Sequence, residues 1–520
     1  MTLQGLAAQA PRSPSRRLWR CWVWLLLLPG PAAALTLKDV QVVGVDGDAR
    51  RNIELALSLS RIPPTQLLSE QRLAYLLGEA PEQARQALQP LGYYLAEVEV
   101  DSRRVGDAVS VRVQVRTGPP VRVQQLGLGI DGPGGEDPVL RRQLARFAPG
   151  RGEVLHHGRY EASKTAIERQ LAARGYFAAT RSQARVEVEP AAGRADIALR
   201  WSSGERYRIG AVQFEGNPFR PGLLEALVDW PDNSAFDEER LLQLQRRLFD
   251  LDYFSAVEVR ALPEQDDGLV RPVLVDLLPA KRSRYRAGLR YGSDTGAGIN
   301  AGYERRWLNT RGHKWASELA ISERLQEVGS QYRIPAFARG GWYSLQAGLR
   351  DERLPELHTR LLQLVGNRSG RWRDWQWLAG LHWQRERYPG DGLDPDFRYV
   401  TLVYPALSLQ WSRSDDPLYP RRGRAVSAEL RGGSHVLGSD VDFVQLRVEG
   451  RWLQPLGERY RLLLRAEAGT TGSDNFADLP PSLRFFAGGD RSVRGYGYKR
   501  IGLAADEGPG GGRHLLVGSV

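Results

Sequence analysis

The stretch FFAGGDRSVRGYGY at residues 485–498 decides how the rest of the chain is interpreted. It places one arginine between a valine and a glycine and surrounds it with further glycines and two tyrosines. Glycine adopts backbone conformations that other residues avoid, so this composition predicts a tightly turned loop. A loop that positions an arginine needs a folded wall behind it, and the preceding residues indicate what that wall is. The candidate site residues of this loop are Val493, Arg494, Gly495, Tyr496, Gly488 and Gly489.

Residues 1–34 have the pattern of a secretory signal peptide. Four arginines and no acidic residue precede a short apolar run at 21–28, and Ala32-Ala33-Ala34 supplies small residues for cleavage. The run is too short to cross a bilayer as a helix, which takes about 20 residues. An uncleaved membrane anchor is the alternative. Cys21 is the only cysteine of the chain, so the mature protein is expected to form no disulfide and no cysteine-based metal or catalytic site.

The length and charge indicate several domains and no nucleic-acid partner. A chain of 520 residues is too long for one ordinary hydrophobic core. Its net charge of +11 falls to +7 without the four arginines of residues 1–34, which is moderate for a protein of this size. No later apolar run approaches the roughly 20 residues of a spanning helix, so a membrane protein with this sequence would have to be a β-barrel.

Residues 35–281 contain a threefold internal repeat with a period near 80 residues. Each unit opens with a short strand that ends in glycine, continues through helical patterns and reaches an aromatic pair that feeds another strand. The opening strands are 40–44, 123–127 and 212–216, and the pairs are Tyr93-Tyr94, Tyr176-Phe177 and Tyr253-Phe254. Three small modules with β-α-α-β-β order are therefore expected at 35–120, 121–205 and 206–281.

The third unit has the most legible helix. Ser234 is expected to cap its start, with Asp237 three residues later completing a capping box. Apolar residues then recur at helical spacing and are expected to face the core. They are Leu241, Leu244, Leu248 and Leu251.

From residue 282 the apolar pattern has a period of two, which is typical of strands with one apolar face. About a dozen such runs follow at hairpin spacing, many near the 9–11 residues that cross a bilayer at a tilt. Nine of the 14 tryptophans lie at positions 307–452, as in an aromatic girdle. A soluble β-sandwich would also alternate, but these two features favour an antiparallel transmembrane β-barrel. The tryptophans near run ends include Trp307, Trp342, Trp411 and Trp452.

The three modules resemble POTRA domains, and Val493-Arg494-Gly495-Tyr496 is similar to the VRGY or VRGF motif of the BamA/TamA superfamily. In that superfamily a long loop carrying the motif folds back into the barrel lumen. Three POTRA-like units make the chain most similar to the TamA-like members. The resemblance implies an α+β POTRA region in the periplasm and a sixteen-stranded barrel in the Gram-negative outer membrane. It also implies insertion of outer-membrane proteins such as autotransporters.

The resemblance also implies partners and residue roles. The partners are an inner-membrane-anchored TamB-like protein, unfolded outer-membrane protein clients and the lipid bilayer. Arg494 would pair with polar and acidic groups of the barrel wall, Gly495 would permit the turn, and Tyr496 would stack on the arginine or the wall. A weakly closed seam would let client strands pair with the first strand of the barrel. The candidate seam residues are Tyr285, Ala287, Leu289 and Tyr291.

The strand pattern ends at Val520, inside the twelfth predicted strand at 513–520. The barrel at 282–520 is therefore expected to be partial, with about 12 of the 16 strands that the resemblance implies. Nothing upstream looks degenerate, which favours a fragment over a nonfunctional protein.

The sequence indicates no enzyme, no cofactor and no metal site. The triplet Asp294-Thr295-Gly296 occurs in aspartic proteases, but no second copy supplies the paired carboxylate. His156-His157 lacks a metal-binding spacing such as H-E-x-x-H. Open sheet edges of the modules are expected to pair with client strands, although the modules are alternatively mere spacers. Two other functions stay open: a two-partner secretion transporter or pore, and a tether between membranes with a role in lipid homeostasis.

Overall fold

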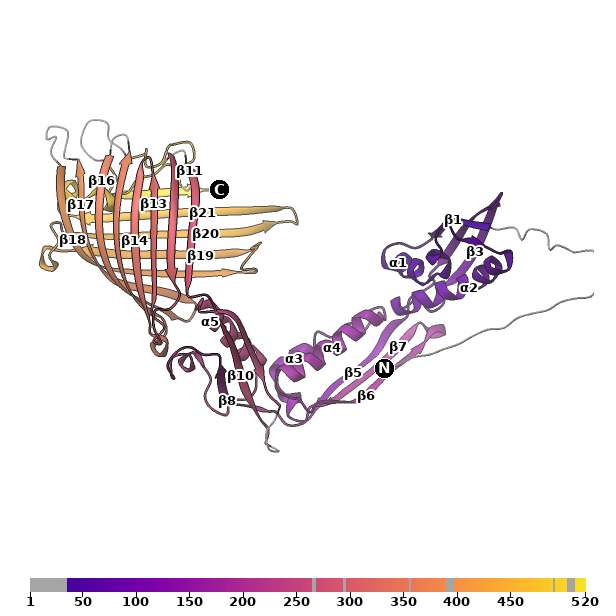
Figure 1. The fold of residues 1–520 in the computed structure, drawn as a ribbon. Helices are drawn as coiled ribbons and strands as arrows, with labels where there is room; N and C mark the ends of the chain where they lie inside the picture. Colours follow the sequence, from indigo (N-terminus) through magenta and orange to yellow (C-terminus); the bar gives the residue numbers. More distant parts are fainter. Residues whose placement is uncertain are drawn as a thin grey trace, which may run out of the picture. The chain divides into compact units, whose positions relative to one another are not determined.

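The computed structural model of the chain describes residues 35–263, 268–292, 296–354, 357–389, 397–489, 492–502 and 510–520 (Figure 1). The predicted signal peptide, Asp294 and Thr295 lie outside these ranges. The chain divides into two compact units, the first ending at Glu205 and the second beginning at Arg206, with residues 173–175 belonging to the second. Among the described residues, no helix is both long and apolar enough to cross a membrane.

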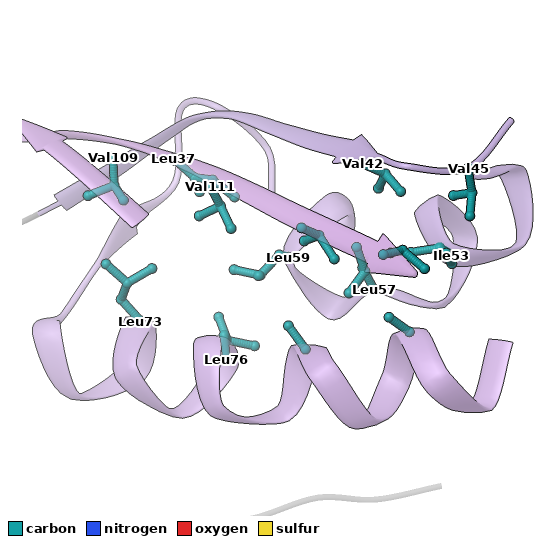
Figure 2. Close-up of a cluster of buried hydrophobic side chains, with 14 of the residues drawn as sticks. Leu37, Val42, Val45, Ile53, Leu57, Leu59, Leu73, Leu76, Val109 and Val111 are labelled. Atoms are coloured by element: carbon teal, nitrogen blue, oxygen red, sulfur yellow. The ribbon is translucent and has the colours of Figure 1, made fainter. Parts of the chain in front are cut away.

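The first module is a four-stranded sheet covered by two helices. The strand order is β2-β1-β4-β3, with β1 and β4 parallel. Alternating apolar residues of β4 face an apolar stripe on α2, and Figure 2 shows Leu73 and Leu76 pointing toward Val109 and Val111. Burial of this cluster holds the module together. Its elements are β1 (Leu35–Val43), α1 (Gly47–Ala56), β2 (Leu67–Leu68), α2 (Glu70–Leu88), β3 (Glu97–Val105) and β4 (Ala108–Arg116), with 3-10 turns at Ser58–Arg61 and Gln89–Leu91.

The second module has the predicted β-α-α-β-β order, but its opening strand is longer than the sequence suggested. The strand continues through the expected end at Gly127 as far as Asp131, and the chain turns at Gly132 with a φ of +90°. In the histidine pair, His157 Nε2 lies 2.8 Å from the Tyr94 hydroxyl, and burial lowers the pKa of His157. The elements are β5 (Arg122–Asp131), α3 (Pro138–Leu144), α4 (His157–Ala173), β6 (Thr180–Glu189) and β7 (Arg194–Ser202), in the strand order β5-β7-β6.

The third module departs from the prediction at its first helix, which is only a 3-10 turn at Glu225–Leu227. Asp237, not Ser234, caps the following helix, because its carboxylate accepts the N–H of Glu239 at 3.2 Å while the Ser234 hydroxyl donates to the carbonyl of Pro231. The four predicted core leucines of that helix are buried. The elements are β8 (Arg208–Glu215), α5 (Glu238–Asp250), β9 (Phe254–Ala261) and β10 (Val270–Pro279), in the strand order β8-β10-β9.

The remaining strands form one antiparallel sheet of 12 strands in sequence order, and the sheet curls strongly (Figure 1). Strands β11 to β13 have only 9 or 10 residues, whereas β16 to β18 have 15 to 18. The strands are β11 (Ser283–Gly292), β12 (Gly296–Arg305), β13 (Lys314–Ser322), β14 (Leu325–Pro335), β15 (Trp342–Leu354), β16 (Leu357–Trp372), β17 (Trp375–Pro389), β18 (Phe397–Ser414), β19 (Gly423–Gly433), β20 (Phe443–Leu456), β21 (Tyr460–Ser473) and β22 (His514–Ser519).

Two of the four tryptophans assigned to a girdle do something else. Trp307 is only 5% exposed, and its ring lies 6.1 Å from Phe219 of the third module. Trp342 lies 6.5 Å from the ring of Tyr253, whose hydroxyl donates to the carbonyl of Gly312 in the β12–β13 turn and whose pKa is raised by burial. A position near a strand end therefore did not distinguish tryptophans of the aromatic girdle from tryptophans that contact the third POTRA-like module. Trp411 and Trp452 do lie on outward positions of β18 and β20.

Candidate functional site inside the barrel

The described residues of the connection between β21 and β22, which are 474–489, 492–502 and 510–513, fold onto the inner face of the sheet. The first part of this connection contains 3-10 turns at Phe476–Asp478 and Pro481–Leu483. Leu479 and Leu483 are buried to within 1% and pack in one cluster with inward-facing Tyr388, Leu402 and Tyr404 of β17 and β18. We refer to residues 476–487 as the anchor segment. The prediction of a long loop held against a barrel wall therefore has a structural counterpart in this segment.

Polar side chains of the wall hold the backbone of the anchor segment. Gln445, 1% exposed on β20, donates from Nε2 to the Leu483 carbonyl and to the Thr471 hydroxyl, both at 2.6 Å. The Tyr388 hydroxyl donates to the Asp478 carbonyl at 3.2 Å. Because these donors are buried, each would be costly to leave unpaired. These hydrogen bonds therefore hold the anchor segment at one position on the wall.

Arg484 ties the two arms of the loop together. Its guanidinium donates to the Leu479 and Ala477 carbonyls at 2.6 Å and to the Gly510 carbonyl at 3.0 Å. The same group lies 5.3 Å from the centre of the Phe476 ring. Several carbonyls converging on one planar fork use a geometry that lysine cannot reproduce. Sequence reasoning passed over this residue, although it lies directly before the quoted stretch.

The predicted motif forms a compact turn beyond the anchor segment. Gly488 and Gly489 have φ of +110° and +94°, and a side chain on Gly488 would collide with the carbonyl of Gly497. The Gly489 N–H donates to the Tyr496 carbonyl at 2.8 Å, so the structure brings the glycines and the tyrosine together. We refer to residues 492–498 as the motif segment.

Arg494 lies at the exposed tip of the motif segment, together with Gly495 and Tyr496. No hydrogen bond or ion pair joins Arg494 to any described residue. Lys499 instead reaches the wall: its Nζ lies 2.7 Å from Glu352 of β15, and the Glu352 side chain is only 9% exposed. The role of Arg494 therefore stays a prediction, and the observed wall contact belongs to a residue that the sequence did not single out.

The loop and the wall enclose a polar cavity of about 900 Å³. Arg447 and Glu467 form an ion pair of 2.7 Å in its lining. Glu386 is 1% exposed; its Oε1 accepts the N–H of Ser482 at 3.3 Å, and its Oε2 has no partner among the described residues. Within the described ranges, no group of three or more histidine, cysteine, aspartate or glutamate side chains is arranged to hold a metal ion. The described lining of the cavity thus offers charged and polar groups to the loop that borders it.

The candidate seam strand lies at one edge of the sheet. Within the described residues, β11 pairs only with β12, and its Tyr285, Leu289 and Tyr291 are 76%, 89% and 83% exposed. Ala287 is also exposed, so the four predicted residues share the outer face. Arg290 on the opposite face lines the polar cavity. The strand has the predicted alternation, and its role as a seam stays a prediction.

Comparison with known proteins agrees with this arrangement. Residues 403–520, which include part of β18, strands β19 to β22 and the whole loop, match the Omp85 superfamily domain. The C-terminal part of the chain is therefore an Omp85 superfamily domain. Residues 39–117 of this Omp85 protein match the first POTRA domain of TamA, and residues 207–274 match a POTRA domain described as a surface antigen variable number repeat.

One solved structure with a TM-score above 0.5 shares the fold at low sequence identity. BamA from Haemophilus ducreyi lacking POTRA domains 1–3 has a TM-score of 0.59 and 15% identity, covering 76% of this chain and 81% of that chain. CdiB from Escherichia coli gives a TM-score of 0.42 and 14% identity, covering 73% of each chain. BamA POTRA domains 3–5 from Haemophilus influenzae give 0.28 and 18% identity, covering 48% of this chain and 99% of that chain.

Membership fixes the orientation of the barrel. This Omp85 protein has its barrel in the outer membrane and its POTRA domains in the periplasm, and it acts in outer-membrane protein assembly or transport. Assembly factors of the family are not enzymes. Because β11 follows the third POTRA module directly, the end of the sheet where β11 begins is periplasmic. The ends of β15 and β21 and the starts of β16 and β22 therefore lie at the extracellular end.

Proposed function

We propose that this Omp85 protein is a TamA-type outer-membrane component that inserts or helps secrete outer-membrane proteins, autotransporters among them, with an inner-membrane-anchored TamB-like partner. The match of residues 39–117 to the first POTRA domain of TamA is the observation that carries this proposal. The loop that fills part of the barrel interior supports it, since its anchor segment is held by wall residues from several strands.

Client strands would pair with β11. An edge strand presents unpaired N–H and C=O groups that can add a strand without demanding a client sequence. The strands next to this edge are short, so fewer backbone hydrogen bonds resist local opening there than in the long strands β16 to β18. Tyr285, Ala287, Leu289 and Tyr291 would then face lipid beside the incoming strand.

The POTRA modules would deliver the client. Strands β3, β6 and β9 each form one edge of their sheet, and β3 and β6 are exposed along most of their 9 and 10 residues. Such edges suit an unfolded, strand-forming polypeptide in the periplasm. The exposed guanidinium of Arg494 would bind a partner outside the described residues. Val493, Gly495 and Tyr496 would shape the turn that carries Arg494. Gly488 and Gly489 would shape the backbone that leads to this turn.

Site-directed crosslinking tests the strand pairing. Cys21 is the only native cysteine, so a Leu289→Cys variant with Cys21 replaced carries one thiol. In cells that express a full-length autotransporter with single cysteines along its last strand, we expect disulfide adducts at alternate client positions. Leu345→Cys is the matched control, because Leu345 is 61% exposed on the same outer face but lies on β15, inside the sheet. Adducts of equal yield at both positions would contradict pairing at β11.

Depletion separates assembly from the alternatives. We expect loss of the protein to reduce surface levels of autotransporters while leaving the outer-leaflet lipid balance unchanged in the first generations. A change in lipid balance that precedes any loss of client would instead support a tether with a role in lipid homeostasis. Client secretion that needs no membrane insertion would support a secretion pore.

A further inference from the structure

The outer face of β15 to β17 carries a group of arginines near the extracellular ends of the strands. In the register of the sheet, Asp351 lies opposite Arg360, and Arg360 lies opposite Arg387. Alternation along the strands places these residues on the outer face, the same face as the exposed Leu349 and Leu362. We refer to Arg353, Arg360, Arg385 and Arg387 as the outer arginine cluster.

One acid organises half of this cluster. The Asp351 carboxylate accepts a hydrogen bond from Arg353 Nε at 3.2 Å and two from Arg360, at 3.0 and 2.7 Å. His358 Nε2 lies 3.1 Å from the same carboxylate, and Asp351 is only 8% exposed beneath these groups. Paired arginines around a covered carboxylate are held in fixed orientations. This half of the cluster is therefore built before any ligand binds.

Aromatic rings position the other half. The Arg387 guanidinium lies 3.9 Å from the centre of the Phe397 ring, and that of Arg385 lies 5.4 Å from the Tyr399 ring. Among the described residues, neither arginine has a carboxylate within ion-pair distance. A guanidinium that stacks on a ring keeps its N–H donors at the edge of the plane, available to an anion.

The cluster adjoins an apolar belt. Leu349, Leu362 and Leu364 lie nearer the middle of the strands and are 43%, 42% and 46% exposed. Among the described residues, Asp351 is the one carboxylate that pairs with any of the four arginines, and the carboxylate of Asp440 beside β18 accepts the N–H of Thr401. An excess of positive charge next to an apolar belt at a membrane boundary favours an anionic lipid headgroup. An arginine on the lipid-facing surface that had no anionic partner would be costly.

We propose that the outer arginine cluster binds the phosphate groups of a phosphorylated glycolipid in the outer leaflet, with the acyl chains of that lipid lying along the leucine belt. Guanidinium groups match phosphate oxygens with two parallel hydrogen bonds, and four of them in fixed orientations suit more than one phosphate. The site is separate from client assembly, because none of its residues lies on β11 or in the loop.

Lipid retention tests the proposal. Full-length protein in phosphatidylcholine nanodiscs is mixed with lipid A, a bisphosphorylated glycolipid, or with the same lipid after removal of its phosphates, and bound lipid is counted by native mass spectrometry. We expect at least tenfold greater retention of the phosphorylated lipid. The double variant Arg385→Gln, Arg387→Gln should lower its retention at least tenfold, since neither arginine pairs with a carboxylate in the part of the chain that the structure describes.

A matched double variant distinguishes the cluster from outward arginines in general. Arg368 and Arg424 also point outward over aromatic rings, at 5.2 Å from Tyr343 and 5.8 Å from Trp452, but lie toward the periplasmic end. We expect Arg368→Gln, Arg424→Gln to retain lipid A like the wild type, with both double variants keeping the heat-modifiable migration of a folded barrel. Equal retention of the two lipids, equal loss in both variants, or undiminished retention without Arg385 and Arg387 would each overturn the proposal.

Discussion

Two parts of one loop differ in how the barrel holds them. The anchor segment is buried against strands β17, β18 and β20 and uses backbone carbonyls, leucines and Arg484. The motif segment contains the residues that identify the family, yet Arg494, Gly495 and Tyr496 are exposed at its tip. The segment that fixes the loop therefore has no conspicuous sequence signature. The conspicuous signature sits where a further partner can reach it.

This difference predicts an order of effects on the protection of the loop. Substitutions in the anchor segment should open the whole loop. Substitutions of Lys499 or Glu352, whose contact follows the motif segment, should open only the part of the loop around the motif segment. Substitutions at the tip should leave the loop in place and act on function alone.

Leu483→Ala should have the largest effect. Leu483 is 1% exposed within the apolar cluster, and truncation of a buried leucine costs about 2–5 kcal/mol. If the loop opens in rapid equilibrium, cleavage by a protease of broad specificity should be at least about 30-fold faster, since each 1.4 kcal/mol is about tenfold. Leu437→Ala is the control, because Leu437 is 50% exposed in another extracellular connection. Similar cleavage rates in both variants would show that the anchor segment does not hold the loop.

Arg484→Ala should rank second. The variant loses three hydrogen bonds to backbone carbonyls, but Arg484 is only half-buried and water can replace the guanidinium at these carbonyls, so we expect a net loss of about 1.5–3 kcal/mol, the contribution of one hydrogen bond from a charged group. Hydrogen exchange should rise at the amides near Gly510 as well as near Leu479, because the guanidinium bridges both arms. Arg484→Lys should rescue little, since an ammonium group cannot replace the planar fork. Rescue to wild-type protection by lysine would mean that charge alone matters at this position.

The Lys499–Glu352 pair should rank third. Its 2.7 Å contact joins a side chain that is 22% exposed to one that is 9% exposed, so solvent screens it only in part. A double-mutant cycle with Lys499→Met and Glu352→Gln should give a coupling energy within about 0.5–3 kcal/mol, measured by loop cleavage. Arg51 and Asp48, a pair on helix α1 in which each side chain is 71% exposed, offer a comparison in which coupling should be near the low end. Additive effects of the two substitutions would show that the Lys499–Glu352 contact does not help to hold the loop.

Regular patterns made the fold predictable. Alternation from residue 282 predicted strands with one apolar face, and the threefold repeat predicted three mixed sheets with helices. Local detail was less accessible: Ser234 and Asp237 are both good caps, and only the backbone path shows that the helix begins at Glu238. Trp307 and Trp342 resemble girdle residues in sequence because the contact with Phe219 or Tyr253 depends on tertiary folding.

The wall contacts of the loop were not predictable for a similar reason. Lys499 and Glu352 are 147 residues apart in the chain, and Gln445 meets the loop through a carbonyl rather than a side chain. Neither kind of contact leaves a local motif. A motif marks residues of a recognisable type and spacing, whereas the docking of a loop depends on which inward positions of the wall face it. Arg484 bonds to carbonyls of its own loop, and no sequence motif indicated this role either.

Arg494→Ala should have the smallest effect on the loop and so tests the comparison most sharply. Because Arg494 is exposed and has no partner among the described residues, its truncation should change loop protection by no more than about 0.5 kcal/mol, as at an ordinary surface position. If the arginine acts on a further partner, autotransporter surface levels should nevertheless fall, and Arg494→Lys should restore them in part by retaining the charge. Cleavage as fast as in Arg484→Ala would instead place a wall partner on Arg494, as the family resemblance implies. Normal client levels together with normal protection would show that Arg494 has no role in assembly. The two readouts together therefore decide whether the tip of this loop stabilises the loop against the wall or binds a further partner.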